Sequence, residues 1–134
     1  MGEPLFATTI TTIVEGGRVE EKRSRFAAFG GPCPAEADIR HLIEELARRC
    51  RLAKASHLSW AARIGASDGR VSELKDDGGE SGSGRVILEA MRAKGAGGCL
   101  VLVARWYGGR HLGGVRFRIY RSLSDKLLSA TAGT

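Results

Sequence analysis

The residues of this chain that could do chemistry gather in two glycine-rich segments, 76–85 and 105–114. The first reads Asp-Asp-Gly-Gly-Glu-Ser-Gly-Ser-Gly-Arg, and the second reads Arg-Trp-Tyr-Gly-Gly-Arg-His-Leu-Gly-Gly. Glycines let backbone amides approach a partner, while the acids, arginines and aromatic rings supply charge and a flat apolar face. We therefore expect a binding surface made of Asp76, Asp77, Gly78, Glu80, Ser81, Gly82, Gly84, Arg85, Arg105, Trp106, Tyr107, Gly108, Gly109, Arg110, Leu112, Gly113, Arg116 and Phe117.

Residues 79–86 nearly match the phosphate loop G-x-x-x-x-G-K-[ST]. That loop needs a lysine to reach the β- and γ-phosphates and a hydroxyl to hold magnesium. Arg85 and Val86 stand in those places, and the Val86 side chain has no oxygen for a metal ion. Nucleotide binding or hydrolysis is therefore the weakest of the candidate functions. Free amides at the start of the next helix, together with Arg85, could instead hold a single phosphate or carboxylate.

The acids Asp76, Asp77 and Glu80 allow two interpretations. They could work as general acid and base or hold a hard metal ion, with His57 as a nearby base. Aspartates also cap the amides of tight turns, and this structural interpretation is the favoured one. No serine or cysteine nucleophile stands in a recognisable setting. We expect a protein without enzymatic activity, cofactor or metal.

The second segment is aromatic and basic. Trp106 could stack on bases or on a partner's apolar face, or it could fill a gap at the end of a core strand. Residues 85–134 carry 9 Lys+Arg and 2 Asp+Glu, whereas residues 1–84 carry 12 and 13. The net charges are therefore +7 and −1. This asymmetry suggests an acidic partner, either nucleic acid or a protein surface, with a merely solvated basic face as the alternative.

Size and composition set the class of protein. A chain of 134 residues is expected to form one domain, with a core over about residues 6–128. No stretch reaches the roughly 18 apolar residues of a membrane span, and the first residues do not resemble a secretory signal. Three cysteines with no close pair favour a reducing compartment, so we expect a cytoplasmic protein.

Hydrophobic periodicity indicates the elements that must position the two segments. Strands are expected over 6–14, 25–29, 58–64, 70–74 and 99–104, with Gly16-Gly17 as the first turn. Helices are expected over 35–52, 86–93 and 115–128. The order ββαββαβα predicts an α+β fold of two layers, with a mixed sheet and helices on one face.

Several motifs occur here in the order seen in the IMPACT family, which bacterial YigZ-like proteins also resemble. They are Lys-Arg-Ser-Arg-Phe-Ala at 22–27, Ser-His-Leu-Ser-Trp-Ala-Ala-Arg at 56–63, the segment 76–85, Arg-Trp-Tyr-Gly-Gly at 105–109, and the pairs 112–113 and 116–117. The resemblance covers nearly the whole chain and is closer to the eukaryotic branch. It adds candidate structural or binding positions at Ser24, Arg25, Phe26, His57, Trp60 and Arg63.

The resemblance implies a fold similar to the second domain of ribosomal protein uS5, with a left-handed βαβ arrangement. It also implies a role in regulating translation. Eukaryotic members restrain the amino-acid-starvation kinase that phosphorylates initiation factor 2 alpha, by competing for its ribosome-associated activator, and they bind actin monomers. Bacterial members have a suspected role with nucleic acids.

The sequence departs from the family pattern in three places. It contains neither the RWD domain of eukaryotic members nor the small C-terminal domain of bacterial ones. The family loop reads Asp-Asp-Gly-Glu, whereas here Gly79 takes the glutamate position and Glu80 follows. The expected function is a non-enzymatic regulatory domain that acts in the starvation response through a protein partner. The alternative is an RNA-binding module that uses Arg85, Arg105, Arg110, Arg116 and Arg118, with Trp106 stacking on a base.

Overall fold

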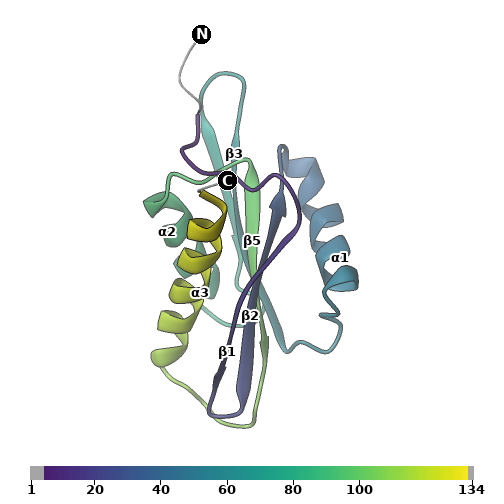
Figure 1. Cartoon of the computed structure of the whole chain (residues 1–134), viewed down its shortest axis with the longest axis vertical. Helices are drawn as coiled ribbons and strands as arrows, with labels where there is room; N and C mark the ends of the chain where they lie inside the picture. The colour runs from purple at the N-terminus through teal and green to yellow at the C-terminus, as the bar shows by residue number, and fades with distance from the viewer. Residues whose placement is uncertain (1–4, 133–134) are drawn as a thin grey trace.

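The apolar run that begins at Cys99 is the central strand of a five-stranded sheet in the computed structural model, which describes residues 5–132. The strands are β1 (Val14–Glu21), β2 (Ser24–Pro32), β3 (His57–Gly65), β4 (Val71–Asp76) and β5 (Cys99–Trp106), in the order β1-β2-β5-β3-β4 (Figure 1). The helices are a short 3-10 turn, η1 (Glu36–Asp38), and α1 (Ile39–Arg49), α2 (Ser83–Ala93) and α3 (Val115–Ala132). None of the helices within residues 5–132 is long and apolar enough to cross a membrane.

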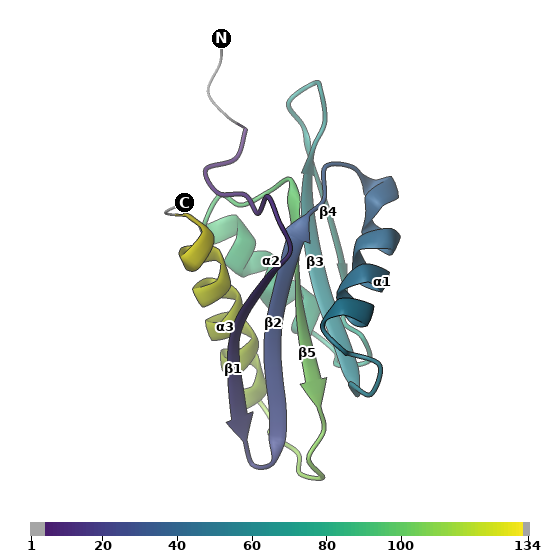
Figure 2. The same ribbon diagram turned by 45° about the vertical axis from the view of Figure 1, so that its right-hand side comes forward.

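The α+β class and the order of elements are confirmed, but two details of the predicted sheet are wrong. All strand pairs are antiparallel, because β5 lies between β2 and β3, which run in the same direction. The helices also cover both faces: α2 and α3 pack on one, and α1 packs on the other (Figure 2). The reason lies in β2, where Phe26 and Ala28 face one layer and Ala27 and Phe29 face the other, so both faces need cover.

The chain makes two crossovers between parallel, non-adjacent strands. One runs from β2 through α1 to β3, and the other runs from β4 through α2 to β5. The first crossover moves across the sheet towards β4, and the second moves back towards β1. The strands that they start from, β2 and β4, run in opposite directions, and their helices lie on opposite faces of the sheet. Two such crossovers have opposite hands, so one of them is left-handed, whereas most βαβ units are right-handed. This agrees with the left-handed unit that the resemblance implied.

The beginning of the chain differs from the prediction. Residues 6–13 form no named strand; they lie beside the turn after α2, with Ala7 N–H bonded to the Gly95 carbonyl. Gly16 and Gly17 lie within β1 and do not turn the chain. A Cβ on Gly16 would approach Leu127 Cδ1 to 2.8 Å, so glycine is needed here because α3 packs closely on the strand. The turn falls instead at residues 22–23, between β1 and β2.

The other expected elements are present with shifted ends. The helix expected over 35–52 is divided into η1 and the shorter α1, and β4 runs on to Asp76, into the first glycine-rich segment. The last helix runs on to Ala132.

We expect Gly78 to be essential for the fold. Its φ is +57°, and a Cβ there would lie 2.1 Å from the Leu58 carbonyl oxygen, an atom of the sheet backbone. Gly78→Ala is expected to lower the free energy of unfolding by about 3 kcal/mol or more, because strain and a backbone clash add together. Gly69→Ala is the matched control, since Gly69 has φ +85° and no atom within 4 Å. It should cost only about 1 kcal/mol in urea unfolding. Equal losses would contradict the importance given to the clash.

Candidate functional site

The segment 76–85 folds into a turn held by its own carboxylates. Asp76 Oδ1 accepts the Gly78 N–H at 2.7 Å. The Asp77 carboxylate accepts the N–H of Gly82 at 3.1 Å and the N–H of Gly84 at 2.8 Å. These two hydrogen bonds, the one from Gly82 foremost, lower the pKa of Asp77. The expected phosphate or carboxylate site at the start of α2 is therefore wrong, because Asp77 already occupies these amides.

Side chains from β3 and α2 fix this turn to the sheet. The Ser59 hydroxyl donates to the Asp77 carbonyl at 2.9 Å, and the Ser83 hydroxyl lies 2.7 Å from Ser59 Oγ. His57 Nδ1 donates to the Gly78 carbonyl at 3.0 Å, which leaves Nε2 facing Glu80 Oε2 at 3.8 Å. His57 therefore holds the turn in place through a hydrogen bond to its backbone.

Glu80 is the centre of the site, and only 7% of it is exposed. Its Oε2 accepts a hydrogen bond from Arg105 Nη1 at 2.5 Å, and its Oε1 accepts the hydroxyl of Tyr120 from α3. Arg116 Nε lies 3.8 Å from Oε2. We call these four residues and His57 the Glu80 cluster. The cluster joins both glycine-rich segments to the last helix.

Arg105 is 3% exposed, and two aromatic rings lie close to its guanidinium group. Its guanidinium carbon lies 5.2 Å from the centre of the Phe26 ring and 5.5 Å from that of Tyr107. Its Nη2 donates to Ser24 Oγ at 3.3 Å, while Nε has no hydrogen-bond partner among the described residues. Such a cation is stable only with its carboxylate in place. Burial, and then the Glu80 carboxylate, raise the pKa of Tyr120, which stays a hydrogen-bond donor.

A cavity of about 450 Å³ opens beside the cluster. The two predicted segments meet around it, and its walls include His57, Glu80, Ser81, Arg105, Tyr107, His111, Leu112, Gly113 and Arg116. Within residues 5–132, no three His, Cys, Asp or Glu side chains gather closely enough to hold a metal ion. The segments thus lie together in space, and their role in binding stays a prediction.

Other predicted site residues lie elsewhere. Trp106 follows Arg105 along β5, so its side chain points to the opposite face, where it meets Arg25 across the paired strands. Arg85 is exposed and pairs with Glu89 at 3.0 Å. Three further predicted residues contribute to the fold. Phe26 is buried in the core, and Trp60 packs on the α1 face. Arg63 donates hydrogen bonds to Glu73 and to the Ala96 carbonyl.

The loop after β5 supplies the outer rim. Gly108 is required there, because a Cβ would lie 2.2 Å from the Arg23 carbonyl carbon. Gly109 and Arg110 are exposed. The Arg116 guanidinium stacks on Phe117 at 4.3 Å, close to Gly82 of the other segment.

Sequence reasoning missed Tyr120, Ser59 and Ser83. Tyr120 falls in the apolar stripe of the last helix, and spacing alone assigns such a residue to the core. The only available signal was its hydroxyl, since a buried tyrosine needs a hydrogen-bond partner.

Comparison with known proteins decides the family. The family model described as the Impact N-terminal domain matches residues 22–128, which is most of the chain. The chain belongs to the IMPACT family. The match spans β2 through most of α3, so it includes every residue of the Glu80 cluster.

Three IMPACT relatives illustrate the similarity. Protein IMPACT of Xenopus laevis is 33% identical over 121 residues, covering 89% of this chain and 38% of that protein. The IMPACT homologue of Schizosaccharomyces pombe is 32% identical over 117 residues, covering 87% and 42%. That of Dictyostelium discoideum is 31% identical over 108 residues, covering 81% and 31%. This IMPACT-family chain thus spans less than half of the length of these relatives.

Two solved structures share the fold. The crystal structure of a hypothetical protein matches with a TM-score of 0.71 at 22% identity, covering 93% of this chain and 59% of that one. The two-domain translational regulator Yih1 matches with a TM-score of 0.58 at 26% identity, covering 91% and 48%.

We expect Glu80 and Arg105 to be strongly coupled. Glu80→Gln and Arg105→Met should each lower the free energy of unfolding by about 3–5 kcal/mol, because each leaves a buried charge without its partner. The double variant should lose less than the sum of the two, with a coupling energy of about 2 kcal/mol or more in a double-mutant cycle. The exposed pair Arg85–Glu89 is the control, with an expected coupling below about 0.5 kcal/mol. Additive losses at Glu80 and Arg105 would refute the role given to the cluster.

Asp77 should make stability depend on acid pH. A lowered pKa in the folded chain means that the carboxylate stabilises the fold above its unfolded pKa of about 3.9. This contribution is lost as pH falls through the folded pKa. Asp77→Asn should therefore lower the urea midpoint clearly at pH 7, and the difference from wild type should shrink towards pH 3. A constant difference from pH 7 to pH 3 would show that the charge of Asp77 is not what stabilises the turn.

Proposed function

We propose that this chain is a regulatory binding domain that acts on translation through a protein partner. The observation that carries the proposal is the match to the IMPACT family over residues 22–128, joined to the likeness to the translational regulator Yih1. The chain covers only part of these proteins, so the proposal concerns what this domain contributes. The resemblance suggests two partners to test, the ribosome-associated activator of the starvation kinase and monomeric actin.

The rim of the cavity is the proposed contact surface. Tyr107 is 45% exposed and Val115 is 40% exposed, which makes them two of the three large apolar side chains exposed among the described residues. Arg110 and His111 lie between them in the same loop. Tyrosine and arginine are frequent at the centres of protein interfaces. An aromatic and basic rim of this kind suits an acidic protein surface.

The state of the acids supports a binding role without catalysis. Both oxygens of Glu80 accept hydrogen bonds, from Arg105 and Tyr120, and both oxygens of Asp77 accept backbone N–H groups. A general base must lie within hydrogen-bond reach of a substrate proton, whereas each of these oxygens is directed at a donor of the fold. These carboxylates already serve the fold, which favours recognition by the surrounding rim.

The test removes the rim contacts, and because the Tyr107 ring also packs on Arg105, urea unfolding of the variant checks that the fold is kept. Tyr107→Ala with Arg110→Glu is expected to lower affinity for the partner by about 100-fold or more, because it removes an apolar anchor and reverses a charge. Affinity would be measured by calorimetry with the purified ribosome-associated activator and with monomeric actin in separate titrations. In starved cells, the wild-type chain should lower phosphorylation of initiation factor 2 alpha, and the double variant should not.

Arg70→Glu is the matched control, since Arg70 is exposed in the β3–β4 turn, away from the rim. It should bind like wild type. If neither protein binds the wild-type chain, and initiation factor 2 alpha phosphorylation in starved cells is unchanged, the proposed function is wrong. If the chain binds and both variants bind equally well, the function stands but the rim is the wrong surface.

A further inference from the structure

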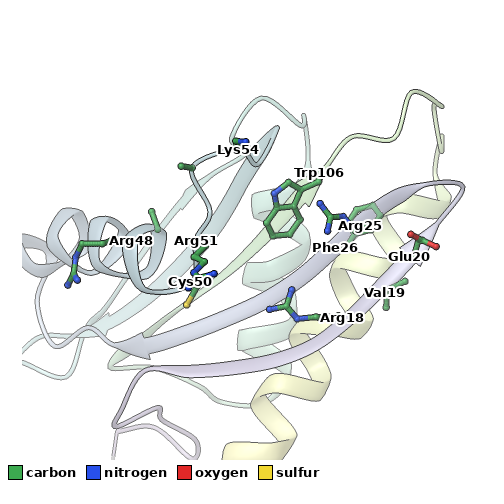
Figure 3. Close-up of a pocket in the computed structure, with 12 residues that line it drawn as sticks. Arg18, Val19, Glu20, Arg25, Phe26, Arg48, Cys50, Arg51, Lys54 and Trp106 are labelled. Carbon is green, nitrogen blue, oxygen red and sulfur yellow. The ribbon is translucent and has the colours of Figure 1, made fainter.

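A second and larger hollow, of about 950 Å³, lies on the α1 face of the sheet, away from the Glu80 cluster (Figure 3). One wall comes from β1 and β2, the other from the end of α1 and the loop after it, and Trp106 lies between them. Five cations line it, namely Arg18, Arg25, Arg48, Arg51 and Lys54, against one acid, Glu20. We call this hollow the basic groove.

These cations are free to meet a ligand. All five are exposed, and in the part of the chain that the structure describes none of them takes part in an ion pair. Several arginines elsewhere are paired with acids, as Arg105 is with Glu80 and Arg92 is with Glu73. Like charges that face one another across a groove repel, so an anion between the walls would relieve that repulsion.

Backbone conformation points to the same place. Only three described non-glycine residues have positive φ: Lys22 at 45°, Arg23 at 70° and Arg51 at 58°. All three are basic. Arg51 lines the groove, and Lys22-Arg23 turns the β1–β2 hairpin that forms one wall. Two-residue hairpin turns with positive φ favour Asn-Gly. This chain instead keeps cations in conformations that cost free energy, as residues at binding sites often do.

The groove also holds a flat apolar surface. The Arg25 guanidinium carbon lies 5.4 Å from the centre of the Trp106 ring, and Figure 3 shows the two side chains next to each other at the mouth of the groove. Trp106 is only half-buried. Indole and guanidinium planes are the surfaces on which unpaired bases stack.

We propose that the basic groove binds single-stranded nucleic acid, with phosphates held by the five cations and a base stacked at Trp106. An acidic peptide would be attracted by the charges but would make no use of the ring. A duplex would make no stacking contact with the Trp106 ring either, because its bases are already stacked on one another. The combination of cations without ion pairs and a half-buried aromatic ring beside an arginine therefore favours a single strand. This site lies apart from the rim proposed for a protein partner, so each can fail while the other stands.

Fluorescence anisotropy of the full chain with labelled 12-nucleotide oligouridine and oligothymidine tests the proposal. If five phosphates are contacted, affinity should fall about 100-fold between 50 and 200 mM salt. For Arg48→Gln with Lys54→Gln the fall should be about 20-fold, since two contacts are lost. The control Arg118→Gln with Lys126→Gln, at exposed positions of α3, should keep the wild-type salt dependence. Tighter binding of oligouridine would identify RNA as the ligand. Absence of binding of both oligonucleotides at 50 mM salt would overturn the proposal.

Two further variants separate this role from a structural one. Lys22→Asn with Arg23→Gly should raise the thermal midpoint, because Asn-Gly suits the turn, and should weaken oligonucleotide binding at least fivefold. Trp106→Ala should weaken binding about tenfold, and Trp106→Phe should restore most of it. Equal losses for Ala and Phe would exclude stacking. Polyglutamate is the competing ligand. If it binds as tightly as the oligonucleotides, and if Trp106→Ala changes the binding of neither, the groove is a site for acidic peptides and our proposal is refuted.

Discussion

The buried ion pair between Glu80 and Arg105 is the interaction on which the rest of this structure depends. Taking two charges out of water costs several kcal/mol for each ion, and the cost is offset only by good geometry and further hydrogen bonds. Tyr120 and Ser24 supply those bonds, and the rings of Phe26 and Tyr107 enclose the guanidinium. The pair therefore joins the loop before α2 to the end of β5 and, through Tyr120, to the first half of α3.

The glycines of the first segment follow from this requirement. Gly78, Gly79 and Gly82 all have positive φ, and they bend the chain sharply between β4 and α2 so that Glu80 points inward. From this bend the Glu80 side chain reaches Arg105. Asp77 fills the amides at the start of α2, where a phosphate loop would hold its ligand. The resemblance to a phosphate loop thus has a physical reason, because in both cases a tight turn of backbone N–H groups binds an anion. In this chain the anion is the carboxylate of its own Asp77.

Sequence reasoning found most of the elements because their periodicity is strong, as in the apolar run of β5. It also predicted that the two glycine-rich segments meet. It could not assign Arg105 and Trp106 to different surfaces. Adjacent residues of a strand point to opposite faces, but the strand was expected to end at residue 104, before both of them. The role of Tyr120 was not predicted, because its apolar neighbours in the helix assigned it to the core. Gly16-Gly17 was wrongly predicted to be a turn, and at Gly16 the close packing of α3 on the strand favours glycine instead.

Net charge was the least reliable guide, because it counts cations without asking which are already satisfied. The C-terminal part carries the excess charge of +7, yet Arg105 is neutralised by Glu80 from the other part of the chain. The basic groove draws all five of its cations from residues 1–84, the part of the chain whose net charge is −1. Arg25 and Arg105 lie on adjacent, paired strands at the same end of the sheet. One faces the open groove beside Trp106, whereas the other faces α3 and is buried with a carboxylate. At this end of the sheet, therefore, Arg105 is neutralised inside the protein, whereas Arg25 on the opposite face can still meet the charge of a ligand.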